Sequence, residues 1–228
     1  MTGRRHFLTG AGAIVATAAW PLRARAAPEN WQARLVAAAR SQIGVTTLYD
    51  PSYVRLDYPG GDVPRERGVC TDVIVRAYRD ALGIDLQVLL HEDMRRSFAA
   101  YPRNWSMAAP DANIDHRRVP NLRTFFRRKG ADLGPWSGAA DFATGDLVSQ
   151  LLPGNLPHIA VVSNARSHDG ATPLVIHNIG AGAREENTLL RDHRPLPLPW
   201  SLETLLVQRR FDPGRPRRWP GLGEVDDG

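Results

Sequence analysis

The chain has 228 residues, one cysteine and a formal charge of +5 at pH 7. Its length suffices for one domain with a single core, and a lone cysteine excludes an intrachain disulfide. The first 26 residues hold four of the 29 basic residues, Arg4, Arg5, Arg23 and Arg25, and no acidic residue. Without them the formal charge falls to +1, so the composition gives no support for nucleic-acid binding.

Residues 1–26 have the features of a twin-arginine signal peptide. The pair Arg4-Arg5 precedes a weakly apolar run over 11–20, and Ala24-Arg25-Ala26 provides a small-x-small cleavage site. The apolar run is shorter than the roughly 20 residues that a membrane-spanning helix needs. We therefore expect cleavage after Ala26, a periplasmic or otherwise exported mature protein, and no stable membrane anchor after cleavage.

Apolar spacing predicts an α+β domain over residues 27–211, with N-terminal helices packed on an antiparallel sheet. A tail over 212–228, rich in proline, glycine and charge, is predicted to be disordered. Helices are expected over 29–41, 70–82 and 86–101, and from a cap at Asn121 through Phe126. The first of these would have Trp31, Leu35, Val36 and Ala39 on one face. Strands are expected over 144–148, 157–163 and 173–179, with a turn over 164–170 between the last two and a further strand within 200–211.

The only cysteine, Cys70, begins a predicted amphipathic helix that Gly83 ends. The unpaired amides and the dipole of a first helical turn favour negative charge, which lowers the pKa of a thiol. In an oxidising compartment an unpaired cysteine is either buried and inert or retained for chemistry. Cys70 is therefore a candidate nucleophile, and a small core residue is the alternative interpretation.

Two of the predicted strands carry histidines. If Ser163 lies opposite Leu174, then Ala160 pairs with His177, and His158 and His177 share one face of the sheet. They are then diagonal neighbours, about 7 Å apart at the backbone and within side-chain reach. A slip of one residue would place them on opposite faces.

A thiol at a helix start and two imidazoles on one sheet face match the nucleophile, base and orienting group of acyl transfer. We expect Cys70 to be the nucleophile, His158 the base and His177 the orienting residue, with Asn178 as a substitute for the last role. The Cys70 backbone amide is a natural oxyanion donor. His116, in a polar run ahead of a predicted helix, is a further candidate for lining the cleft.

Several segments together carry a resemblance to a known family. A helix-leading Cys70, Gly-Asp-Leu-Val at 145–148, His-Ile-Ala-Val-Val at 158–162 and a strand ending in His177 resemble the NlpC-type branch of the papain-like cysteine hydrolases, bacterial enzymes that cut peptide bonds in the cell wall. The segments Asn-Ile-Asp-His-Arg-Arg-Val-Pro at 113–120 and His-Asn-Ile-Gly at 177–180 resemble, more narrowly, an exported bacterial family catalogued as domain of unknown function 1287.

This resemblance implies a papain-like fold and a cysteine peptidase or amidase with Cys70, His158 and His177 as its triad. It implies a peptide or amide substrate, such as peptidoglycan, and neither a cofactor nor a metal ion. Tyr58, twelve residues before Cys70, is similar to the family tyrosine that helps to hold the oxyanion. Where the NlpC-type pattern is Asp-Cys-Ser-Gly, this chain has Val-Cys-Thr-Asp at 69–72, so the groups beside the thiol differ.

Two alternatives stay open at the level of the sequence. A non-catalytic binding module can keep the same fold, because fold does not imply function. Cys70, His158, His177 and Asp146 are also residue types that bind zinc. The sequence specifies neither the substrate, nor hydrolysis over transfer, nor the oligomeric state.

Overall fold

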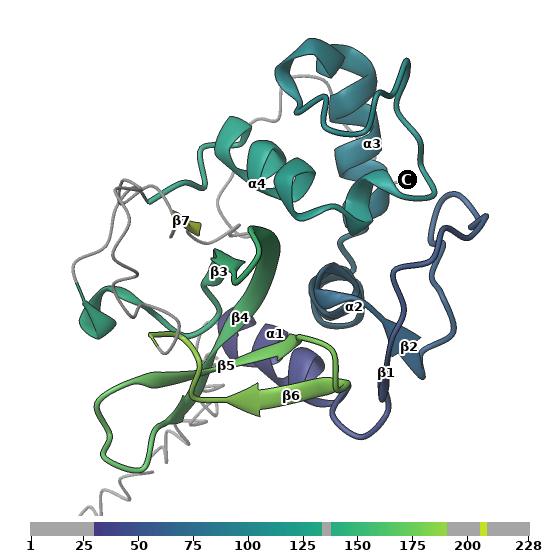
Figure 1. The fold of residues 1–228 in the computed structure, drawn as a ribbon. Helices are drawn as coiled ribbons and strands as arrows, with labels where there is room; N and C mark the ends of the chain where they lie inside the picture. The colour runs from purple at the N-terminus through teal and green to yellow at the C-terminus, as the bar shows by residue number, and fades with distance from the viewer. Residues whose placement is uncertain (1–29, 134–137, 191–205, 209–228) are drawn as a thin grey trace, which may run out of the picture.

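The computed structural model describes residues 30–133 and 138–190, together with the strand 206–208. Within these ranges the four α-helices precede the five-stranded antiparallel sheet, as expected for an α+β protein, and a separate pair of short parallel strands, β1 and β2, lies between the first two helices in the chain (Figure 1). The elements are α1 (Trp31–Arg40), β1 (Leu48–Tyr49), β2 (Arg67–Gly68), α2 (Cys70–Leu82), α3 (Leu86–Ser97), the 3-10 turns η1 (Phe98–Ala100) and η2 (Asp115–Arg117), α4 (Val119–Arg128), η3 (Ala139–Asp141), β3 (Leu147–Leu152), β4 (Leu156–Arg166), β5 (Pro173–Asn178), β6 (Ala183–Glu186) and β7 (Leu206–Gln208).

Helix α2 occupies the predicted range and lies at the centre of the molecule (Figure 1). Its first turn is closed by Asp72, whose carboxylate accepts a hydrogen bond from the Val69 N–H at 2.7 Å. It ends at Gly83, whose φ of +66° is the left-handed conformation that glycine adopts without strain. Every residue from Cys70 to Tyr78 is buried, because α1, the sheet and α3 pack around this helix.

The sheet has the strand order β6-β5-β4-β3-β7. Strands β4 and β5 pair as Val161 with Ile176 and Val162 with Val175, which is the predicted register. The predicted turn between these strands is present but begins later than the predicted 164–170: β4 continues to Arg166, and the chain reverses between Ser167 and Thr172, where the Ser167 N–H donates to the Thr172 carbonyl at 2.8 Å. A register shift after Val162 accommodates the extra residues.

Two apolar clusters cover the two faces of this sheet. On one face α1, α2 and α4 pack against the alternating strand residues Leu147, Ile159, Val161 and Ile176. On the other face Phe142 and Leu189 pack against Val148, Ala160, Val162 and Val175. The second face is the one that carries the two histidines.

The remaining predicted elements are partly confirmed. Helix α1 buries the four residues expected on its inner face. Helix α4 begins earlier than predicted, and Asn121 lies inside it, where its side-chain amide donates to the Asp115 carbonyl at 3.1 Å instead of capping a helix end. Strand β6 was missed, while β7 falls within the range expected for a last strand.

The proposed signal peptide and the proposed tail at 212–228 both lie outside the described residues. Among the helices that the structure does describe, none has the length and apolar character needed to cross a membrane.

Candidate active site

Cys70 lies at the first position of α2, with its side chain almost fully buried at 3% exposure. Burial raises the pKa of its thiol to about 11, although hydrogen bonds from the backbone at Ile159, Thr71 and Cys70 itself act in the opposite direction. The sequence predicted a lowered thiol pKa from the helix start alone. That prediction was wrong because desolvation outweighs the amides. The thiol is therefore protonated at neutral pH.

His158 and His177 meet side chain to side chain. His158 Nε2 lies 2.8 Å from His177 Nδ1, and both rings are buried. Their shared sheet face, inferred from the register of β4 and β5, is confirmed. Burial, and then the nearby His177, lower the pKa of His158 to about 3, so this imidazole is neutral at physiological pH.

The thiol contacts the backbone of β4 next to His158. A hydrogen bond from the backbone at Ile159, the residue after His158, reaches the Cys70 sulfur. Within the described residues no hydrogen bond joins that sulfur to the His158 ring, and His158 Nδ1 has no hydrogen-bond partner. Catalytic hydrogen bonds are often long in unliganded enzymes and shorten when substrate binds. Nδ1 thus remains available to take a proton.

Asn178, expected as a substitute orienting group, forms hydrogen bonds with the backbone instead. Its side-chain amide donates to the Gly68 carbonyl at 3.0 Å, two residues before Cys70, and its oxygen accepts from the Gly180 N–H at 3.2 Å. Asn178 is fully buried. It therefore links the end of β5 to the segment that leads into α2.

Tyr58 lies in contact with α3, where its ring packs edge-on against His91 with centroids 5.3 Å apart. The tyrosine that the structure places near the start of α2 is Tyr49, which pairs with Gly68 across β1 and β2. Burial and then the charge of Cys70 raise the pKa of Tyr49. Counting back from Cys70 could not identify Tyr49, because the path of the loop over 50–66 is not encoded in residue spacing.

His116 is buried at 2% exposure and does not line an open surface. Its neighbour Arg117 explains the polar run instead: this buried guanidinium binds the Asp72 carboxylate at 3.0 Å and the carbonyls of Asp50 and Ser52 at 2.9 Å. The Thr71 hydroxyl donates to the Arg117 carbonyl at 3.0 Å. The Thr-Asp pair that departs from the NlpC-type pattern therefore anchors η2 to the nucleophile helix.

Two polar residues beside His158 and His177 were not found from the sequence. Gln150 of β3 lies directly opposite His158 in the sheet register. Glu186 of β6 places Oε2 at 3.3 Å from His177 Nε2. The only signal available for Glu186 was its position in the charged stretch Ala-Arg-Glu-Glu, which does not read as a strand.

The four residues considered as zinc ligands, Cys70, His158, His177 and Asp146, form no metal-binding group among the described residues. Asp146 Oδ2 accepts a hydrogen bond from the Ala143 N–H at 2.7 Å. Over residues 30–133 and 138–190 no three His, Cys, Asp or Glu side chains are arranged to hold a metal ion.

Comparison with known proteins identifies the family. The family model described as "Domain of unknown function (DUF1287)" matches residues 36–195. The chain belongs to the DUF1287 family. A member of similar sequence is "Uncharacterized protein YijF" of Escherichia coli (strain K12), which is 57% identical over 151 residues, covering 66% of this chain and 73% of that protein. The matched range of the DUF1287 model contains Tyr49, Cys70, His158, His177 and Glu186.

Proposed function

We propose that this DUF1287 protein is an exported cysteine hydrolase with a papain-like, NlpC-type fold, which cleaves an amide bond in a cell-wall stem peptide. The observation that carries the proposal is the 2.8 Å contact between His158 and His177 beside a helix that begins with the only cysteine. A nucleophile, a base and a group that orients the base are the parts that acyl transfer requires.

The reaction begins with a neutral thiol and a neutral imidazole, as their pKa values of about 11 and about 3 require. As the Cys70 sulfur bonds to the amide carbonyl carbon, its proton passes to His158 Nδ1. The tetrahedral intermediate then expels the amine, which takes that proton from His158. Water attacks the resulting thioester and gives a proton to His158. The second tetrahedral intermediate then releases the acid and expels the Cys70 thiolate, which takes that proton from His158, so that both groups end neutral.

Charge on the tetrahedral oxygen is stabilised by groups at the helix start. The Cys70 N–H belongs to the first turn of α2, where amides lack helical partners and the helix dipole favours an anion. Tyr49, rather than Tyr58, is the tyrosine placed to contribute a hydroxyl donor. This assignment follows from its pairing with Gly68 and its electrostatic contact with Cys70.

The cellular location and the substrate in this proposal are inferred from the sequence. The signal features over residues 1–26 support export by the twin-arginine route and a periplasmic mature protein without a membrane anchor. The resemblance to NlpC-type enzymes supports a peptide or amide substrate within peptidoglycan. No cofactor, metal ion or nucleic acid takes part in the proposed reaction.

The test is mass spectrometry of muropeptides incubated with the mature chain, residues 27–228, and with its Cys70→Ala variant. We expect stem-peptide fragments with the natural chain and none with the variant. Equal turnover by both proteins would end the cysteine-hydrolase proposal, because no other thiol exists in the chain.

A non-catalytic binding module is the second candidate. The observation that favours it is a buried, protonated thiol with no hydrogen bond to His158 among the described residues. Titration calorimetry with the same muropeptides separates the two functions. A binding module would bind them with equal affinity as natural chain and as Cys70→Ala, and would release no fragment.

A further inference from the structure

Glu186 contacts His177 at Nε2, the ring nitrogen that does not contact His158. Strand β6 pairs with β5 so that Glu186 lies opposite Val175 and Arg184 lies opposite His177. Glu186 Oε2 is 3.3 Å from His177 Nε2, and its other oxygen is 3.6 Å from Arg184. With His158 Nε2 2.8 Å from His177 Nδ1, the side chains of Glu186, His177 and His158 form a continuous row.

The contact between the two histidines does not by itself determine which nitrogen carries the proton. A neutral imidazole donates from one ring nitrogen and accepts at the other. The 2.8 Å contact forms equally well with His158 as donor or with His177 as donor. Only the first arrangement leaves a lone pair on His158 Nδ1, where a base for Cys70 is needed.

Glu186 removes this ambiguity. An ionised carboxylate accepts hydrogen bonds and donates none, so the His177 nitrogen facing it, Nε2, must carry the proton. His177 Nδ1 then has the lone pair and accepts from His158 Nε2–H. His158 Nδ1 is consequently unprotonated. Loss of the carboxylate would let both rings reverse together, and the reversed pair would hold a proton on the nitrogen that must receive one.

We propose that Glu186 is a positioning residue that sets the tautomer of His177 and, through it, that of His158. The tautomer assignment follows from the geometry alone. Its use in catalysis rests on the proposed function, in which His158 Nδ1 takes the thiol proton. His158, with a pKa lowered to about 3, is neutral at physiological pH, and a tautomer is defined only for a neutral ring.

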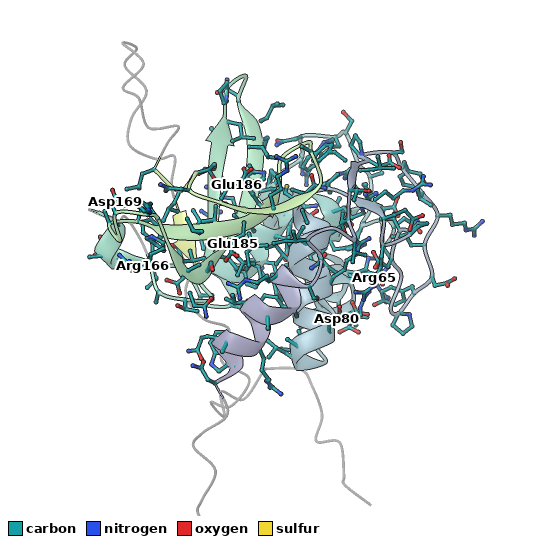
Figure 2. All side chains as sticks on the ribbon, turned by 90° about the horizontal axis from the view of Figure 1, so that it is seen from below. Arg65, Asp80, Arg166, Asp169, Glu185 and Glu186 are labelled. Carbon is teal, nitrogen blue, oxygen red and sulfur yellow. The ribbon has the colours of Figure 1, made fainter. Side chains whose placement is uncertain are left out.

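The preceding residue offers a matched control. Glu185 lies opposite Ile176 and projects from the other side of β6 (Figure 2). Its carboxylate binds the Arg40 guanidinium at 2.7 Å and 3.0 Å and also accepts from the Ser163 hydroxyl. A Glu185→Gln change therefore removes a carboxylate of the same strand and weakens packing between α1 and the sheet, without touching either histidine.

The experiment is NMR of ring nitrogens in the mature chain labelled with ¹⁵N-histidine, at neutral pH, with assignments from His158→Gln and His177→Gln. In the natural chain we expect protons on Nε2 of both histidines. In Glu186→Gln, whose amide can donate as well as accept, we expect Nδ1-protonated forms of both rings to appear. Glu185→Gln should keep the natural pattern.

Two results would overturn the proposal: an Nδ1-protonated His177 in the natural chain, or unchanged tautomers in a folded Glu186→Gln variant. Should that variant not fold, the natural chain alone decides by the first criterion. In muropeptide hydrolysis we expect Glu186→Gln to lower kcat about 10-fold with KM unchanged, and Glu185→Gln to leave kcat unchanged. Absence of hydrolysis in the natural chain would sink the proposed function and leave the NMR result standing.

Discussion

At the scale of single residues, two opposing effects set the pKa of Cys70, the proposed nucleophile. Backbone hydrogen bonds at Ile159, Thr71 and Cys70 stabilise a thiolate, whereas burial destabilises it more strongly. A resting ion pair between Cys70 and His158 is therefore disfavoured. In the proposed reaction the thiol proton therefore moves during attack on the substrate, which makes the tautomer of His158 important.

The first prediction concerns alkylation of Cys70 by iodoacetamide. Because the thiol pKa is raised to about 11, the rate should be low at pH 7 and should still increase between pH 8 and pH 10. The chain has one cysteine, so the mass increase of the intact protein reports this site alone. Protein unfolded in urea is the control and should level off near the ordinary thiol pKa of about 8.5. A plateau below pH 8 in the folded protein would indicate a preformed thiolate instead.

The second prediction separates the roles of the two histidines. His158→Ala removes the base and should lower kcat by about 10³-fold, whereas His177→Ala should lower it by about 10- to 100-fold, because water can occupy part of the orienting position. Asn178 cannot take over, since its amide is bound to Gly68. Steady-state kinetics on muropeptides measure both variants. Equal losses would mean that His177 does more than orient His158.

At the scale of elements, α2 organises its surroundings through buried charges. Arg76, with 1% of its side chain exposed, binds the Asp62 carboxylate and the carbonyls of Val63 and Arg67. One turn earlier, Asp72 binds Arg117. These contacts attach the loop over 50–68 and the turn η2 to the helix that carries the nucleophile.

The third prediction compares a buried ion pair with an exposed one. Arg117→Met leaves the Asp72 carboxylate buried and unpaired, at 4% exposure, and should lower the free energy of unfolding by about 3–5 kcal/mol. Arg65→Met removes the exposed Arg65–Asp80 pair (Figure 2) and should cost less than about 1 kcal/mol. Urea denaturation measures both. Similar costs for the two variants would show that the Asp72–Arg117 pair does not hold the elements together.

Elements with a clear apolar period could be predicted from the sequence, and so could the part of the site that they carry. The register of β4 and β5 follows from two buried alternating runs, and it brought His158 and His177 together correctly. Strand β6 could not be predicted, because four residues with two glutamates and an arginine show no apolar alternation. Glu186 was missed with it.

Residue positions that depend on loops, and pKa values that depend on burial, could not be predicted from the sequence either. Tyr58 was named from the family resemblance and Tyr49 was missed, because spacing along the chain does not report how a loop folds back on β2. The pKa of Cys70 was misjudged for a related reason. A helix start can be recognised locally, whereas desolvation depends on α1, the sheet and the segments that close over the thiol.

At the scale of the whole molecule, the interior holds several titratable groups that respond to pH in opposite directions. Burial lowers the pKa of His116 to about 4 and that of His158 to about 3, and it raises the pKa of Asp115 to about 6. Between pH 4 and pH 6.5 the unfolded chain binds more protons than the folded chain at the two histidines, which favours unfolding as the pH falls. Asp115 has the reverse effect over about pH 4–6.

The last prediction is that stability decreases on acidification. Protonation of His116 and His158 favours unfolding and outweighs the opposite effect of Asp115. The free energy of unfolding should therefore fall by about 2–3 kcal/mol between pH 7 and pH 4.5. Below pH 4 the decline should continue, because Asp93, with a pKa lowered to about 2 chiefly by Arg128 and Lys129 against the effect of burial, becomes protonated. Urea denaturation across this range measures the slope.

His116→Gln tests the origin of that slope. Because the glutamine cannot titrate, the variant should lose about half of the histidine contribution, whatever its stability at pH 7. The natural chain, measured over the same pH range, is the reference for this comparison. A natural chain that is as stable at pH 4.5 as at pH 7 would mean that His116 and His158 reach water without unfolding, and so that the region around the candidate active site opens in the folded state.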